Sequence, residues 1–272
     1  RADCEKKGGV VMNGAMTAII RKDFRAVTTN KHLLTGLLVV PIALTIVMPS
    51  IFLFMIHFAP EETDIQKMLE ILPPSMRSEN PELTAAGMVL NFVLPVFFLI
   101  IPVMAASIMA ASSFVGEKEK HTLETLLYCP LSVKEIFRAK VIASFLLSMM
   151  VSAISFLAMI LVLQAEAFFL IGSFLVPNVS WLIILLLVSP AVSLIAVTLI
   201  VRGSAKARSM EESQQSAVFL IIPIILLMVG QFAGLLIISV WIITGLGTAC
   251  ALIAWLLLKK CMSRFTYEML LR

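Results

Sequence analysis

Long apolar runs alternate with short polar segments along most of the chain. Four runs have the length of one membrane-crossing helix and occupy residues 33–58, 85–115, 141–163 and 181–201. A further run, residues 217–258, is too long for one crossing and predicts two helices that break within residues 230–239. Because an α-helix needs about 20 apolar residues to cross a bilayer, the pattern predicts an all-α membrane protein with six transmembrane helices within residues 33–258.

Prolines interrupt the first two runs. Pro41 and Pro49 lie in the first run, where each removes a backbone donor and predicts a kink. The second run, residues 85–115, would be about 45 Å long as a helix, against a hydrocarbon core of about 30 Å. We therefore expect it to tilt, to bend at Pro95 or Pro102, or to project beyond the bilayer.

The N-terminal segment, residues 1–32, contains an amphipathic stretch at residues 15–29. Apolar side chains recur there at helical spacing, at Met16, Ile19, Ile20, Phe24 and Val27. Between them lie Arg21, Lys22, Asp23 and Arg25. The pattern predicts a helix lying in the membrane interface, with its basic side toward lipid headgroups.

Composition and charge agree with the apolar runs. The chain is 60% hydrophobic and 14% charged, with a mean hydropathy of +1.02, whereas soluble domains carry about 25% charged residues. The apolar residues form runs instead of alternating, which disfavours a β-barrel. Every Lys and Arg except Lys67 and Arg77 lies in residues 1–32, 116–140, 202–216 or 259–272. The positive-inside rule therefore predicts that both termini are cytoplasmic, that residues 259–272 form a cytoplasmic tail, and that Trp181 lies at the outer membrane boundary.

Several kinds of catalytic chemistry have no motif in this chain. It contains no GxxxxGK[ST] loop for nucleotide phosphates, no HExxH and no G-x-S-x-G elbow, so we expect no catalytic residues and no bound cofactor of its own. The cysteines fit no zinc or redox spacing, and no metal site is expected; they are Cys4, Cys129, Cys250 and Cys261. No Asp, Glu, Lys or Arg lies well inside a predicted span, which disfavours a proton-driven secondary transporter.

One predicted span carries a serine stripe. Ser144, Ser148, Ser152 and Ser155 recur at intervals that place them on one helix face. Small residues commonly permit close packing of membrane helices, and we favour that interpretation. The alternative is a polar stripe that lines a substrate pathway.

The charged segment 116–140 has two local helix signals. Residues 122–129 predict a short helix that ends before Pro130; its apolar face holds Leu123, Leu126 and Leu127, and its acidic residues are Glu117, Glu119 and Glu124. Ser132 and Glu135 then have the spacing of a capping box, which starts the helix of the third span. The segment predicts a short helix across the cytoplasmic ends of two spans, with a leucine face that requires a partner.

These residues resemble a known family. The acids at 117, 119 and 124, Thr122-Leu123, Leu126-Leu127, Pro130, Ser132, Glu135-Ile136 and Lys140 are similar to the signature of ABC-2 type transporter permeases, closest to the sodium-export-like branch. The six-span layout resembles that family along the whole chain. His121 stands where the family often has glycine, which affects the local turn.

The resemblance implies a mechanism and partners. The short helix would be a coupling helix that docks on a separate ABC ATP-binding subunit, which holds ATP and Mg. A second, identical or homologous permease completes the complex. By matching position, the coupling contact would be made by Glu117, Glu119, Thr122, Leu123, Glu124 and Leu127. Alternatively, these acids form a solvated face and the leucines anchor the segment to the membrane surface.

The resulting functional hypothesis is an ABC exporter permease in a prokaryotic inner membrane, in contact with lipid and not with nucleic acid. The small predicted outer loops favour export over uptake. The polar run at residues 209–215 also resembles the family and suggests a second, weaker ATPase contact. The alternatives are a secondary transporter or channel without an ATPase, and a membrane scaffold.

Overall fold

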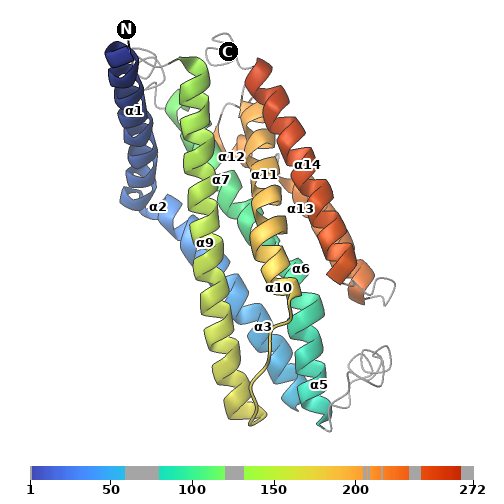
Figure 1. The fold of residues 1–272 in the computed structure, drawn as a ribbon. Helices are drawn as coiled ribbons and strands as arrows, with labels where there is room; N and C mark the ends of the chain where they lie inside the picture. Colours follow the sequence, from blue (N-terminus) through green and yellow to red (C-terminus); the bar gives the residue numbers. More distant parts are fainter. Residues whose placement is uncertain are drawn as a thin grey trace.

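The structure is a computed structural model that describes residues 2–58, 80–119, 132–204, 207, 209–215, 217–232 and 240–264. Every regular element within these ranges is helical (Figure 1). The N-terminal helix α1 (Ala2–Thr29) is followed by six helical stretches long and apolar enough to cross a membrane. They run over Lys31–Phe58, Pro81–Glu119, Lys134–Leu170, Ser180–Ser204, Met210–Gln231 and Val240–Ser263. The predicted all-α membrane fold with six spans is therefore confirmed.

Each candidate span is built from one or more elements. The first contains α2 (Lys31–Leu34), η1 (Thr35–Val39) and α3 (Val40–Phe58), and the second α5 (Pro81–Met88), η3 (Val89–Val93), α6 (Leu94–Phe98) and α7 (Ile100–Glu119). The third is α9 (Val133–Leu170), and the fourth joins α10 (Ser180–Ile183), η4 (Ile184–Val188) and α11 (Ser189–Ser204). The last two contain α12 (Met210–Gln215), α13 (Val218–Phe232) and α14 (Val240–Arg264).

The second and fourth spans form the centre of the bundle. Their most apolar windows are 78% and 61% buried, against 17–39% for the other four. The outer helices expose large apolar side chains, as a lipid-facing surface requires. The start of α1 and the end of α14 lie at the same end of the bundle (Figure 1), which supports the predicted placement of both termini on one side.

Three spans contain a widened helical turn directly before a proline. The π-helical segments η1, η3 and η4 end two residues before Pro41, Pro95 and Pro190, respectively. Proline cannot donate a backbone hydrogen bond and its ring crowds the preceding turn, so one extra residue is accommodated there. The second span is interrupted again at Leu99, between α6 and α7. The interruption expected at Pro95 is thus present.

Trp181 compensates for the donor that Pro95 lacks. In the widened turn the amide of Leu94 donates to the carbonyl of Val89. The amide of residue 95 would in the same way donate to the carbonyl of Leu90, but residue 95 is proline and has no amide hydrogen. The indole Nε1 of Trp181 donates to the Leu90 carbonyl at 3.1 Å. Trp181 is 2% exposed and packs edge-to-face on Phe98. Trp181 lies at the predicted outer end of the fourth span, which begins at Ser180, and this hydrogen bond and aromatic packing hold the indole inside the bundle.

The N-terminal helix packs on the bundle. Ile19 and Val27 of α1 are 6% and 2% exposed, and Ile19 clusters with Ile136 and Ala139 of α9. The helix also begins earlier than the predicted residues 15–29. Its buried apolar residues face protein, because the long helix α9 extends far enough to cover them.

The third span is longer at both ends than the apolar run predicts. At 38 residues, α9 is about 57 Å long. The apolar run ends at residue 163, but α9 continues to Leu170, so Gln164 and Glu166 lie within the helix. Gln164 receives a hydrogen bond from the amide of Leu175 at 3.0 Å and donates to its carbonyl, which holds the following loop against the helix end. The apolar run thus stops before the polar residue Gln164, whereas the helix α9 continues to Leu170.

The long C-terminal apolar run divides as predicted. Helix α13 ends at Phe232 and α14 begins at Val240, and the residues between them lie outside the described part of the chain. Before α13, the amide of Glu212 donates to the hydroxyl of Ser209 at 3.2 Å, a capping contact at the start of α12.

Helix α14 approaches the fourth span closely at one glycine. A Cβ on Gly247 would lie 2.8 Å from Cδ2 of Leu187 and 3.0 Å from Cγ2 of Val188. We expect Gly247→Ala to lower the free energy of unfolding by about 1 kcal/mol, because the branched Val188 cannot move aside freely. Gly245→Ala is the control, since a Cβ there meets nothing within 4 Å. Unfolding in mixed detergent micelles measures both; equal stability of the two variants would contradict the close approach.

Candidate functional site

The sequence places the coupling contact between α7 and α9. Helix α7 ends at Glu119 and α9 begins at Val133. The predicted contact residues Thr122, Leu123, Glu124 and Leu127 lie outside the described residues. The structure therefore describes the end of α7 and the start of α9, which flank the predicted coupling segment, together with α1 beside them (Figure 1).

The start of α9 has the predicted capping box. The Ser132 hydroxyl accepts a hydrogen bond from the amide of Glu135 at 3.4 Å. The Glu135 carboxylate in turn accepts from the amide of Ser132 at 2.8 Å. Both contacts satisfy donors that a helix start leaves unpaired, so the direction in which the chain enters α9 is fixed locally.

Glu117 lies inside the protein, although it was predicted as a docking contact. It is 7% exposed, and its two carboxylate oxygens accept from Lys22 and Lys140, each at 2.6 Å. A carboxylate engaged on both sides by its own chain is not available to a partner surface. Glu119, the last residue of α7, is exposed. Of the two predicted acids on α7, only Glu119 faces outward.

Lys140 is the centre of this arrangement. Its side chain is 1% exposed and reaches from α9 to α7, where it bonds the carboxylate of Glu117 and the backbone carbonyl of Ser113. The ammonium also lies 5.3 Å from the centre of the Phe114 ring. A buried ammonium needs such compensation, because removing it from water costs several kcal/mol.

Asp23 adds the N-terminal helix to the same cluster. It is 5% exposed, and its Oδ2 accepts a hydrogen bond of 2.6 Å from the Ser113 hydroxyl. Burial raises the pKa of Asp23, against the opposing effects of the Lys140 charge and the Ser113 hydrogen bond. We call Lys22, Asp23, Ser113, Glu117 and Lys140 the inner ionic cluster. The sequence pattern had placed Asp23 on the basic side of the helix, toward lipid headgroups; a lone acid among basic residues was the signal that could have found its buried position.

The inner ionic cluster joins three helices at one point. Asp23 and Lys22 come from α1, Ser113 and Glu117 from α7, and Lys140 from α9. Both α7 and α9 lead directly into the segment that carries the predicted coupling helix. Because buried ion pairs resist separation, these three helix regions are held as one unit.

The serine stripe lies in the packed interior. Ser144, Ser148, Ser152 and Ser155 are all at most 2% exposed. The hydroxyls of Ser148 and Ser152 bond carbonyls of the preceding turn, at 2.8 Å each. Those of Ser144 and Ser155 have no hydrogen-bond partner among the described residues. This burial within a single chain favours the packing interpretation over a pathway.

Comparison with known proteins identifies the family. A family model described as ABC-2 family transporter protein matches residues 17–245, which include α1 from its middle and most of the six spans. No curated protein and no solved structure matches the chain. The match does not address the sodium-export-like branch. In the described residues, no group of three or more His, Cys, Asp or Glu is placed to hold a metal ion. With its six candidate membrane helices, the chain belongs to the ABC-2 family of transporter proteins.

Proposed function

We propose that the chain is the permease subunit of an ATP-driven exporter in a prokaryotic inner membrane, with both termini cytoplasmic. A separate ABC ATP-binding subunit binds ATP and Mg, and docks on the segment between α7 and α9. A second permease, identical or homologous, completes the complex. The family match supports the class, since ABC-2 permeases generally work with such a subunit.

The observation that carries the proposal is the inner ionic cluster. An ATP-binding subunit docked on the segment between α7 and α9 can move the permease only if the ends of these two helices move together with that segment. Lys140 and Glu117 tie those ends together, and Asp23 adds α1. The docking contacts are Glu119 and, in the segment itself, Thr122, Leu123, Glu124 and Leu127. Glu117 acts as an internal anchor for them.

The test combines a charge reversal with a change in the leucine face. We expect Glu124→Arg with Leu127→Asp to reduce the ATP-binding subunit recovered with the permease at least about tenfold, because the apolar contact is lost and a like charge replaces an unlike one. Co-purification from membranes that co-express both subunits measures this. ATP-dependent transport into vesicles should fall in parallel.

A matched control separates docking from general surface charge. Lys260→Glu reverses one charge at the exposed end of α14 and should leave recovery of the ATP-binding subunit unchanged. Full recovery with the double variant would refute the docking surface. Transport that continues without ATP in purified vesicles would favour a secondary transporter instead.

A further inference from the structure

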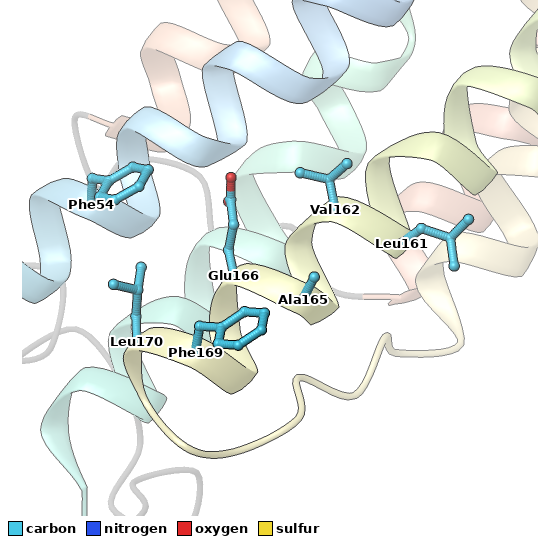
Figure 2. Close-up of a pocket in the computed structure, with 7 residues that line it drawn as sticks. All are labelled: Phe54, Leu161, Val162, Ala165, Glu166, Phe169 and Leu170. Atoms are coloured by element: carbon cyan, nitrogen blue, oxygen red, sulfur yellow. The ribbon is translucent and has the colours of Figure 1, made fainter.

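A pocket opens between α3 and α9 near the end of the bundle opposite the inner ionic cluster (Figure 2). Its volume is about 450 Å³, and its lining residues are Phe54, Leu161, Val162, Ala165, Glu166, Phe169 and Leu170. Glu166 is the one ionisable residue among these seven. Figure 2 shows its side chain rising from α9 toward α3, between the apolar side chains of the wall. The pocket therefore combines an apolar wall with one carboxyl group.

The carboxyl group of Glu166 lies at the depth of apolar residues. Its Oε1 is 2.6 Å from the hydroxyl of Ser50, which lies eight residues before the end of α3 at Phe58. Eight helical residues correspond to about 12 Å along the axis of α3. An ionisable group among apolar side chains of a membrane-spanning helix is costly, and in membrane proteins it commonly marks a site for a charged or polar ligand.

The hydrogen bonding of Glu166 is incomplete. Ser50 has one hydroxyl hydrogen, yet two oxygens lie within reach of it, the Ile46 carbonyl at 2.8 Å and Oε1 of Glu166 at 2.6 Å. The other oxygen, Oε2, is buried and has no hydrogen-bond partner in the described part of the chain. No Lys, Arg or His described in the structure forms an ion pair with Glu166. Among the described residues, the site thus lacks a second hydrogen-bond donor for the carboxylate and a neighbouring positive charge.

The apolar residues that line the pocket indicate that a ligand also needs an apolar part. Phe54 of α3 is 45% exposed, and Leu161 and Phe169 of α9 are 71% and 84% exposed. These side chains open toward the lipid-facing side of the bundle, so a ligand can reach the pocket through the membrane. A purely polar ion would leave the apolar wall uncovered, and an uncharged chain would leave Oε2 without a donor.

We propose that this pocket binds a primary ammonium group carried on an apolar body, with the ammonium donating to the Glu166 carboxylate and the body lying against Phe54, Leu161 and Phe169. A primary ammonium supplies both the positive charge and the hydrogen-bond donors that the site lacks. The proposal concerns binding from the lipid phase and needs no nucleotide.

Binding of dodecylammonium to the full chain in phosphatidylcholine nanodiscs tests the proposal. We expect saturable binding to the wild type, and at least a tenfold higher Kd for Glu166→Gln, which keeps the shape but loses the charge. Ala165→Trp should also weaken binding, because it fills the pocket from an exposed helix position while Glu166 is intact. Glu211→Gln, the same change at an exposed cytoplasmic site, should bind like the wild type.

Two further arms identify the chemistry and its source. Dodecanol, with the same chain and no charge, should bind equally weakly to the wild type and to Glu166→Gln. Phosphatidylethanolamine added to the nanodiscs should compete with dodecylammonium if a lipid headgroup occupies the site, and should not compete if the natural ligand is a free amphipathic amine. Equal affinity of Glu166→Gln and Glu211→Gln for dodecylammonium would overturn the proposal. Because the permease is assayed without its ATPase, failure here is distinguishable from failure of the docking test.

Discussion

Replacing Lys140 by Met is expected to lower the free energy of unfolding by about 3–5 kcal/mol. The ammonium is 1% exposed and bonds the Glu117 carboxylate at 2.6 Å. Methionine has nearly the same length and no charge, so the variant leaves the buried Glu117 without its buried ion-pair partner and removes the cation that offsets the charge of Asp23. Equilibrium unfolding in mixed detergent micelles measures the loss.

Two comparisons make this prediction specific to the buried charge. Lys22→Met also removes an ion pair with Glu117, but the Lys22 side chain is 51% exposed, so a loss below about 1 kcal/mol is expected. Adding Glu117→Gln and Asp23→Asn to Lys140→Met should recover much of the stability, because no buried charge then lacks its partner. Equal losses for the two lysine variants would show that Lys140 does not anchor the cluster.

Replacing Trp181 by Ala is the second change with a large expected effect. The indole is 2% exposed, packs against Phe98 and Phe156, and donates to the Leu90 carbonyl. Alanine leaves a cavity and an unpaired carbonyl, so we expect a loss of about 3–5 kcal/mol in the free energy of unfolding. The same unfolding measurement applies.

The hydrogen bond and the ring can be separated. Trp181→Phe keeps an aromatic ring but cannot donate to Leu90, and should lose about 1–3 kcal/mol. Trp241→Ala removes the same side chain from a position that is 85% exposed and should change stability little in detergent. A phenylalanine variant as stable as the wild type would mean that the Leu90 carbonyl needs no donor from Trp181.

Features that depend on local sequence were predictable. The apolar runs determine the number of helices, because each crossing must satisfy its own backbone in lipid. The capping box at Ser132 and the interruption before Pro95 follow from hydrogen-bond donors and acceptors within a few residues. The division between α13 and α14 follows from the length of the bilayer.

Features that depend on contacts between distant residues were missed. Lys22 and Glu117 are separated by 95 positions, and Asp23 and Ser113 by 90, so no local pattern records that they meet. Glu117 lies in an alternating run of acids and lysines, which resembles a solvated surface. Glu166 follows the apolar run 141–163, so that pattern does not show that the helix continues through it. In each case the neighbouring helices, and not the residue type, decide whether a charge is buried.

The widened turns before Pro41, Pro95 and Pro190 have a mechanical consequence. Each holds one residue more than a regular turn, and releasing that residue along the helix would rotate the part beyond it by about 100° and advance it by about 1.5 Å. Proline prevents the surplus residue from travelling past it, because it has no amide to rebuild the ladder. Three spans therefore each keep one surplus residue at a fixed position along the helix, next to the proline that holds it there.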